Sequence, residues 1–196
     1  MSKLREKAKK TVSRKTVLLV VTGSIAAYKV PDLVKRIRAG GVRVICVMTR
    51  AAREFVTPTV LRAVSDERVY SEMFPQDLPH RVLHTSLAEL PDLVLVAPAT
   101  ANFIAKLAAG IADDLAACVC LATRKPILIA PAMNDGMYTH PITQKNLAQL
   151  KALGYHIVDA VEGHLACGRV GVGHIASEED IGSSVRTLLQ KKNARR

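Results

Sequence analysis

The chain has 196 residues, of which 49% are hydrophobic and 4% aromatic, so one domain with a core of small aliphatic side chains is expected. No apolar run approaches the roughly 18 residues of a membrane span, and the polar N-terminus lacks the apolar stretch of a secretory signal. Most of the net charge of +11 lies in residues 1–15 and 191–196, which argues against a nucleic-acid surface on the body of the chain and favours a soluble, cytoplasmic protein.

Strand and helix patterns alternate along the whole sequence. Residues 15–24, KTVLLVVTGS, predict a buried parallel strand ending in a turn, and 25–41 predict a helix that kinks or restarts at Pro31. The later expected elements are strands at 42–49, 92–100, 125–134 and 155–159, and helices around Pro58 and at 101–123, 139–154 and 177–191, the last capped by Ser177. This order predicts a three-layer α/β fold with a mostly parallel sheet over 16–190, flanked by basic tails at 1–15 and 191–196.

Several polar residues follow predicted strands, at the carboxyl edge where ligands bind in such folds. Gly23 and Ser24 open a helix, whose free N–H groups favour an anion. Thr49, Thr100 and Asn102 follow two other strands and add hydroxyl and amide groups. Together these residues could cradle a phosphate and an attached heterocycle, although the G-x-G-x-x-G dinucleotide fingerprint is absent.

Two strand exits share the sequence Ala-Pro-Ala. We interpret Pro98 and Pro131 as residues that lie just beyond buried strands and terminate them. This interpretation leaves unexplained why Asn102 and Asn134 both stand at the expected ligand-bearing edge.

The cysteines fall into two settings. Cys46, Cys118 and Cys120 lie in apolar segments and are expected to pack in the core. Cys167 lies in HLACGRVGVGH, a stretch so rich in glycine that we expect a mobile loop and no strand. No pair of histidines has metal-ligand spacing, so no metal site is expected.

Four segments carry a resemblance to a known family. In order, GSIAAYK, APATANFIAKLAAGIADDL, PAMNDGMYTHP and HLACGRVGVG resemble the signature segments of the flavin-containing cysteine decarboxylases. The likeness spans residues 16–185 and is strongest to members that decarboxylate phosphopantothenoylcysteine to phosphopantetheine in coenzyme A synthesis. It implies a Rossmann-like flavoprotein with FMN at a subunit interface, a homotrimer or homododecamer, and a ligase on a separate chain.

The resemblance also assigns roles to individual residues. The residues expected to bind FMN are Gly23, Ser24, Ile25, Thr49, Ala99, Thr100, Asn102 and Met133. The residues expected to act in catalysis are the active-site histidine His84, the carboxylate ligand Asn134 and the proton donor Cys167.

Four positions depart from the family pattern and leave the substrate open. Arg169 stands where an acidic residue is usual, His174 where arginine is usual, Tyr138 for tryptophan and Phe103 for threonine. The alternatives are therefore a decarboxylase of peptides that end in cysteine, or a non-catalytic flavoprotein regulatory subunit. A flavin prenyltransferase is disfavoured because the Cys167 loop would then have no role.

The implied chemistry explains why a thiol would stand on such a loop. Loss of CO₂ from an alkyl-cysteine leaves a carbanion with nothing to delocalise into, and oxidation of the substrate thiol to a thioaldehyde supplies the missing electron sink. The enethiolate formed after CO₂ leaves must then be protonated at carbon. A cysteine thiol titrates close enough to neutrality to donate that proton.

Overall fold

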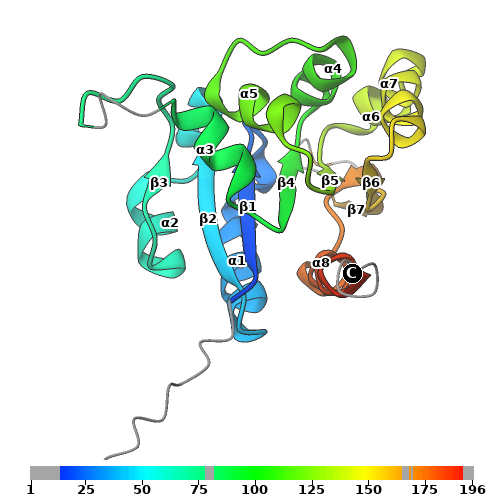
Figure 1. The fold of residues 1–196 in the computed structure, drawn as a ribbon. Helices are drawn as coiled ribbons and strands as arrows, with labels where there is room; N and C mark the ends of the chain where they lie inside the picture. The colour runs from blue at the N-terminus through cyan, green and yellow to red at the C-terminus, as the bar shows by residue number, and fades with distance from the viewer. Residues whose placement is uncertain (1–13, 78–81, 165–167, 169, 192–196) are drawn as a thin grey trace, which may run out of the picture.

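The computed structural model describes residues 14–77, 82–164, 168 and 170–191 (Figure 1). Its central sheet has six strands in the order β3-β2-β1-β4-β5-β6. Their bounds are Thr16–Val21 (β1), Arg43–Met48 (β2), Val69–Tyr70 (β3), Leu93–Ala99 (β4), Ile127–Pro131 (β5) and His156–Ile157 (β6). Every neighbouring pair is parallel, which confirms the predicted parallel α/β fold.

Helices cover both faces of this sheet, because the central strands are apolar on both sides. Val17, Leu19 and Val21 of β1 pack in one core cluster with α1 (Val30–Ala39), α2 (Pro58–Ser65) and α8 (Glu178–Lys191). Leu18 and Val20 pack in the other cluster, whose helices are α3 (Leu83–Glu89), α4 (Ala101–Ala109), α5 (Leu115–Ala122) and α7 (Pro141–Ala152). In Figure 1, α3 and α5 lie in front of the strands and α1 behind them. Within the described part of the chain, no helix is long and apolar enough to cross a membrane.

Helix boundaries follow the local sequence signals. The expected restart at Pro31 is confirmed, because the 3₁₀ turn η1 (Ile25–Lys29) ends there and α1 begins with proline in its first turn. Residues 101–123, expected as one helix, form α4 and α5. Gly110 ends α4 in the left-handed region at φ 71°, and the Asp114 carboxylate accepts from the N–H of Ala117 at 2.8 Å to begin α5.

Residues 170–174, expected as part of a loop, form a strand of a β-hairpin, and residues 165–167 and 169 of the expected loop lie outside the described residues. Strands β7 (Val161–His164) and β8 (Val170–His174) pair antiparallel, apart from the six-stranded sheet. Their glycines permit close packing, since a Cβ on Gly171 would lie 2.9 Å from Asp135 and one on Gly173 would lie 2.3 Å from the Met133 carbonyl oxygen. The glycines that suggested a loop are therefore the residues that let this hairpin pack. Cys167 and Arg169 lie outside the described residues.

Two further expectations need correction. Pro98 lies inside β4 and does not terminate it, and its carbonyl accepts a hydrogen bond of 2.6 Å from the Thr22 hydroxyl. Pro131 is the last residue of β5, where a strand end was expected. Cys46 and Cys120 are buried as expected, and burial raises the pKa of the Cys46 thiol to about 12. Cys118 is only half-buried, because its thiol faces the α4–α5 connection and contacts the Ala112 carbonyl at 3.3 Å.

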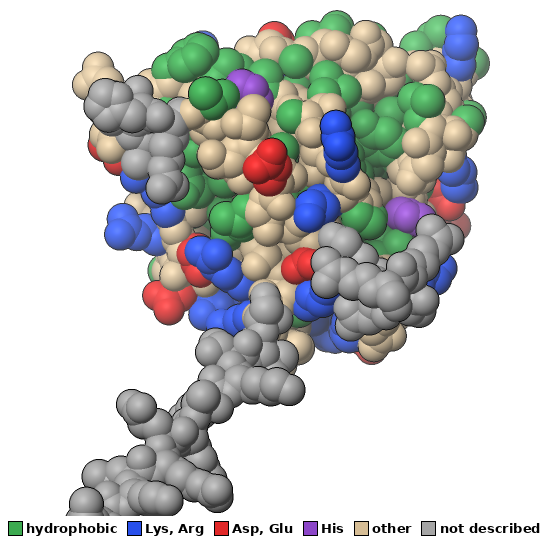
Figure 2. All heavy atoms as spheres, viewed as in Figure 1, with side chains coloured by type: hydrophobic (Ala, Val, Ile, Leu, Met, Phe, Trp, Pro, Cys, Tyr) green, Lys and Arg blue, Asp and Glu red, His purple; other side chains and the backbone are tan. Residues whose placement is uncertain are grey.

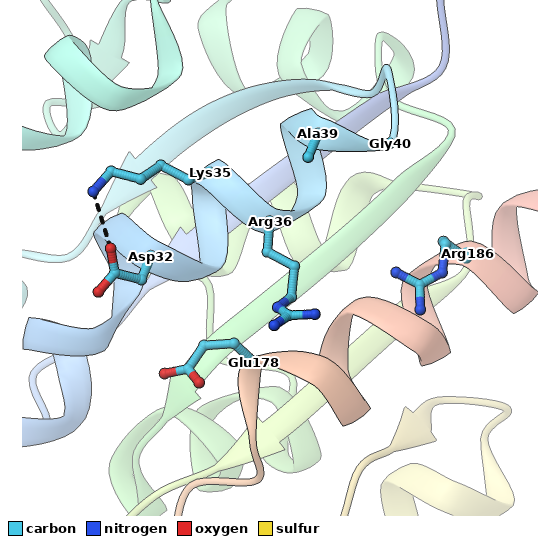
Figure 3. A pocket seen from close by; sticks show the side chains of 7 residues that line it. All are labelled: Asp32, Lys35, Arg36, Ala39, Gly40, Glu178 and Arg186. Carbon is cyan, nitrogen blue, oxygen red and sulfur yellow. Dashed lines mark hydrogen bonds and ion pairs between the residues drawn. The ribbon is translucent and has the colours of Figure 1, made fainter.

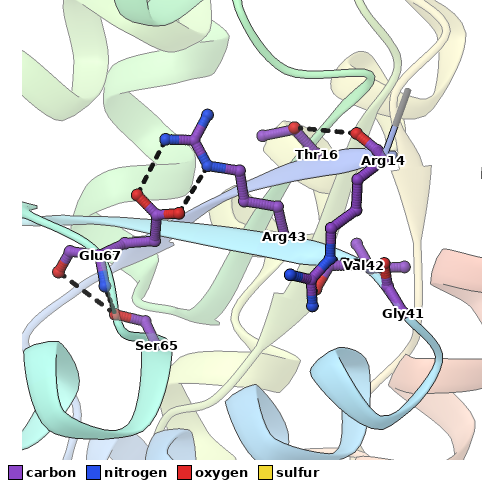
Figure 4. A network of polar contacts seen from close by, with 7 residues as sticks. All are labelled: Arg14, Thr16, Gly41, Val42, Arg43, Ser65 and Glu67. Carbon is purple, nitrogen blue, oxygen red and sulfur yellow. Dashed lines mark hydrogen bonds and ion pairs between the residues drawn. The ribbon is translucent and has the colours of Figure 1, made fainter. Parts of the chain in front are cut away.

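An ion pair ties the start of β2 to the segment before β3 (Figure 4). The Arg43 guanidinium donates two hydrogen bonds to the Glu67 carboxylate, at 2.6 and 2.8 Å. These hydrogen bonds hold the pKa of Glu67 below its ordinary value of 4.5. Arg43 is the first residue of β2, so the pair lies at the amino ends of the strands, away from their carboxyl ends. It therefore contributes to the fold and not to the site.

We predict that Glu67→Gln lowers the free energy of unfolding by about 1 kcal/mol at neutral pH, the upper end for a partly exposed pair because the contact is bidentate. The folded state depresses the Glu67 pKa, so this stabilisation is present above the ordinary value of 4.5 and is lost as the pH falls through the folded pKa. Urea unfolding near neutral pH and in mild acid measures both effects. A difference between variant and wild type that stays constant with pH contradicts the assignment.

Candidate functional site

The switch point of the sheet lies between β1 and β4, which are adjacent while the chain leaves them in opposite directions along the sheet. Ligands of such sheets bind in the crevice that opens there, outside the carboxyl ends of the strands. Thr22 joins the two ends, since its hydroxyl donates to the Pro98 carbonyl at 2.6 Å and accepts from the Thr100 N–H at 3.1 Å. Thr22 was not among the residues predicted from the sequence. Its place between a buried strand and Gly23-Ser24 could have indicated it.

Two cavities adjoin at this crevice. The first, which we call the Thr49 cavity, has a volume of about 630 Å³ and is lined by Thr49 and Asn102. The second, the Asn134 cavity, has about 480 Å³ and is lined by Ser24, Ile25, Met133 and Asn134. Three residues line both cavities: Gly23, Thr100 and Met137. The structure therefore brings most of the predicted site residues together in two neighbouring spaces.

Four of these predicted residues cap the helical turns that begin at the crevice. The side-chain oxygen of Ser24 accepts from Ala26 N at 3.3 Å, and that of Thr49 from Ala52 N at 3.3 Å. Thr100 caps α4 and Asn134 caps α6 (Asp135–Thr139) in the same way. Helix N-termini carry partial positive charge, so their convergence makes the crevice favourable to an anion.

Gly23 is where β1 and the β2 exit come closest. A Cβ atom there would lie 2.4 Å from the Ala51 Cβ, far inside van der Waals contact. Only glycine therefore lets the first strand exit pass the 3₁₀ turn η2 (Arg50–Glu54) at this separation.

Lys106 lies beside the Thr49 cavity but its charge is already neutralised. Its ammonium group contacts Asp113 at 2.7 Å and Asp114 at 3.2 Å. Burial by itself would lower the pKa of Lys106, and the hydrogen bonds to the two aspartates outweigh burial and raise it. This cluster fixes the α4–α5 connection at the cavity wall.

Some predicted site residues lie elsewhere. His84 is in α3, half-buried, and lines neither cavity. Ala99 is fully buried in β4. Its carbonyl accepts a hydrogen bond of 3.0 Å from Ala132 N, two residues before Asn134, and so helps to fix the backbone that leads to Asn134. Cys167 cannot be placed against the cavities because it lies outside the described residues.

The residues that depart from the family pattern lie in different surroundings. His174 lines the Asn134 cavity and Phe103 the Thr49 cavity. Tyr138 is buried in the core at 9% exposure, and burial raises the pKa of its phenol. Tyr138 therefore belongs to the packing beneath the site, whereas His174 can contact a ligand. Lys29, His164 and Met137 also line the Asn134 cavity, and no separate sequence signal pointed to them.

A hollow of about 610 Å³ between α1 and α8 is the main competing location (Figure 3). Two of its three cations have carboxylate neighbours, with Lys35 3.0 Å from Asp32 and Arg36 4.0 Å from Glu179. The hollow lies against two helices and not at the strand exits. We therefore assign ligand binding to the crevice. Among the described residues, no three His, Cys, Asp or Glu side chains are grouped to hold a metal ion.

The chain is similar in sequence and in fold to known proteins. The Flavoprotein family model matches residues 5–190. The chain is 44% identical over 177 residues to a probable phosphopantothenoylcysteine decarboxylase of Streptococcus mutans, covering 89% of this chain and 99% of that protein. It is 42% identical over 170 residues to the coenzyme A biosynthesis bifunctional protein CoaBC of Bacillus subtilis, covering 87% of this chain but only 42% of that protein. The chain thus spans less than half the length of its bifunctional relative.

Solved structures share the fold. A cysteine-to-serine variant of PPC decarboxylase, complexed with pantothenoylaminoethenethiol, superposes with a TM-score of 0.82 at 30% identity, covering 90% of this chain and 99% of that one. The FMN-dependent cysteine decarboxylase SpaF superposes with a TM-score of 0.80 at 33% identity, covering 90% and 96%.

We predict that Gly23→Ala weakens FMN binding at least about 10-fold, because the added methyl group forces the β1 exit away from Ala51. Titration of the apoprotein with FMN, followed by flavin fluorescence, measures the loss. The matched control is Gly23→Ala combined with Ala51→Gly, which removes the nearest atom and should restore part of the affinity. Unchanged FMN affinity in Gly23→Ala would show that the close approach of the two exits does not shape the cofactor site.

Proposed function

Because the chain belongs to the Flavoprotein family, we propose that it catalyses the FMN-dependent decarboxylation of phosphopantothenoylcysteine to phosphopantetheine. The observation that carries this proposal is the pair of adjoining cavities at the β1–β4 crevice. They share Gly23, Thr100 and Met137, so two ligands bound there would meet at a common wall. A redox cofactor and a substrate that exchange electrons need that arrangement.

The residues of the crevice fit FMN. Helix N-termini and hydroxyl groups around Gly23, Ser24 and Thr49 suit a phosphate. Met137 on the shared wall and Met133 in the adjoining Asn134 cavity give an apolar, polarizable surface against which a flat ring can pack. We therefore assign the phosphate of FMN to the Thr49 side and its ring to the boundary between the cavities.

Bound FMN supplies a reversible two-electron oxidation that converts the substrate thiol to a thioaldehyde, from which the neighbouring carboxylate can leave as CO₂. The protein must hold the carboxylate until it leaves, exclude water, and then deliver one proton to carbon. The two electrons taken up by the flavin would return in the last step and give the saturated thiol. Asn134 suits the first task, because a neutral amide donor orients the carboxylate without stabilising it as strongly as a cation would. The capping contact from Gly136 N to Oδ1, 3.0 Å long, fixes the orientation of its side chain.

Strand β8 of the hairpin packs against the turn that carries Asn134. The Gly173 carbonyl accepts from Met133 N at 3.0 Å, and His164 and His174, at the two strand ends, line the Asn134 cavity. We assign Cys167, between these strands, as the donor of the final proton. The solved cysteine-to-serine variant with a bound aminoethenethiol supports this role, since an enethiol is the species expected when protonation fails.

A second copy of the chain would complete the site. Ile25, Tyr28 and Met137 line the Asn134 cavity and are 53%, 60% and 49% exposed. Exposed Leu90, Ile111 and Leu121 lie on the side of α3 to α5, and Figure 2 shows hydrophobic side chains gathered in the upper part of that face. Two different apolar surfaces on one chain suit a head-to-tail interface that closes into a ring such as a trimer. We propose that His84, on α3, acts in the cavity of a neighbouring subunit.

The proposed activity is tested by incubating FMN-loaded protein with phosphopantothenoylcysteine under anaerobic conditions, with CO₂ release and product mass as readouts. Wild type should form phosphopantetheine. Cys167→Ser should still release CO₂ but should protonate the intermediate about 10²- to 10⁴-fold more slowly, the usual effect of losing a general acid. An enethiol product, two hydrogens lighter than phosphopantetheine, should therefore accumulate.

A peptide that ends in cysteine serves as the competing substrate in the same assay. Faster decarboxylation of that peptide overturns the substrate assignment. A protein that binds FMN and releases no CO₂ from either substrate is instead a non-catalytic flavoprotein. Formation of phosphopantetheine by Cys167→Ser at the wild-type rate refutes the proton-donor role alone.

Mixed oligomers test whether His84 acts across the interface. His84→Asn and Asn134→Asp should each be inactive alone, the second because its carboxylate repels that of the substrate. Co-expression of both variants should restore activity in roughly a quarter of the sites, those that combine two intact residues across a head-to-tail interface. If the mixed oligomers stay as inactive as the parents, His84 and Asn134 serve the same subunit.

A further inference from the structure

Lys29 and His174 meet on the wall of the Asn134 cavity. The Lys29 Nζ atom lies 2.8 Å from His174 Nε2, and both side chains are half-buried. Lys29 ends η1 and His174 ends β8, so the contact joins the first strand exit to the hairpin. An ammonium group can only donate, so Nε2 accepts the hydrogen bond and the neutral ring carries its proton on Nδ1.

Lys29 differs from two other half-buried lysines, Lys15 and Lys106. Lys15 lies 3.2 Å from Asp92, and Lys106 contacts two aspartates. Within the described ranges, no carboxylate lies within ion-pair distance of Lys29, and no Asp or Glu is among the residues that line its cavity. The partners of the Lys29 ammonium are both neutral: His174 and the Tyr28 ring, whose centroid lies 6.0 Å away. A half-buried cation with neutral partners gains most when a ligand brings the missing negative charge.

The histidine holds this cation at a defined place. A Cβ on Gly163 would lie 3.1 Å from the His174 ring, so the paired strand β7 presses directly on the imidazole. The ring is thus packed from behind while Nε2 faces Lys29. His174 is a positioning residue for the ammonium group, and the Lys29 ammonium is the only full positive charge that the described lining of the Asn134 cavity offers.

We infer that Lys29, positioned by His174, binds the phosphomonoester of the substrate. This inference rests on the proposed function, in which two phosphomonoesters reach the crevice. The phosphate of FMN is served by the helix N-termini and hydroxyls of the Thr49 side. The substrate carboxylate is served by Asn134. The substrate phosphate still needs a partner. A lysine ammonium at the cavity wall can bind it as a point charge.

The experiment compares phosphopantothenoylcysteine with pantothenoylcysteine, which lacks the phosphate, in wild type and Lys29→Met. Lys29→Met should raise KM for the phosphorylated substrate about 10- to 100-fold, as expected for the loss of a hydrogen bond between charged groups, and leave kcat within about 2-fold. Turnover of pantothenoylcysteine and the affinity for FMN should not change. Lys29→Arg should keep most of the discrimination, and His174→Leu should raise KM for the phosphorylated substrate alone.

Lys35→Met is the matched control, because it removes an equal charge from α1 outside the cavity and should change nothing. If Lys29→Met raises KM equally for both substrates, the inference is overturned. If Lys29→Met binds FMN more weakly, the lysine belongs to the phosphate of the cofactor instead. Wild type that does not discriminate between the two substrates also overturns it.

A binding titration separates this inference from the proposed function. If wild type decarboxylates neither substrate, the proposed function fails, and FMN-loaded protein is titrated with phosphopantothenate and pantothenate. Tighter binding of the phosphorylated compound that disappears in Lys29→Met supports the phosphate site. Equal binding of the two compounds overturns it.

Discussion

Strands β1 and β4 pair in parallel from Val17 with Leu93 to Val20 with Val96, and the chain leaves their carboxyl ends in opposite directions. Everything that we assign to ligand binding follows from this divergence. This divergence opens the crevice, and the Thr22 hydroxyl links the end of β1 to the end of β4 through hydrogen bonds with Pro98 and Thr100. Helical turns begin after both strands, so their unpaired N–H groups face the same space.

The charges of the molecule are arranged so that few of them compete for ligands in this space. Arg43 pairs with Glu67 at the opposite edge of the sheet, and Lys106 pairs with two aspartates beside the Thr49 cavity. The Asn134 cavity is left with neutral donors, helix N-termini and the Lys29 ammonium, while Arg50 and Glu54 line the Thr49 cavity. Such a site favours anions, and it can stabilise two of them without two buried cations, which would be costly to desolvate.

The parallel fold and most of the crevice could be predicted from the sequence, because both depend on local patterns. Buried strands are continuous apolar runs, and capping residues stand directly after them, as Ser24, Thr49 and Thr100 do. The hairpin was missed because its strands are exposed and glycine-rich, so they carry no hydrophobic alternation. Its glycines are required by the Met133–Asp135 turn, which is distant in sequence. The Lys29–His174 contact was missed for the same reason, since it joins residues that only the folded hairpin brings together.

We propose that cofactor and substrate occupy the two adjoining cavities of the β1–β4 crevice. A crystal structure of the FMN-loaded protein with a phosphopantothenoyl-aminoethenethiol would show both ligands at once. We expect the FMN phosphate beside Gly23 and Thr49, the flavin ring against Met133 and Met137, and the enethiol in the Asn134 cavity with its phosphate at Lys29. Flavin density in the hollow between α1 and α8, or an enethiol outside the Asn134 cavity, would refute this arrangement.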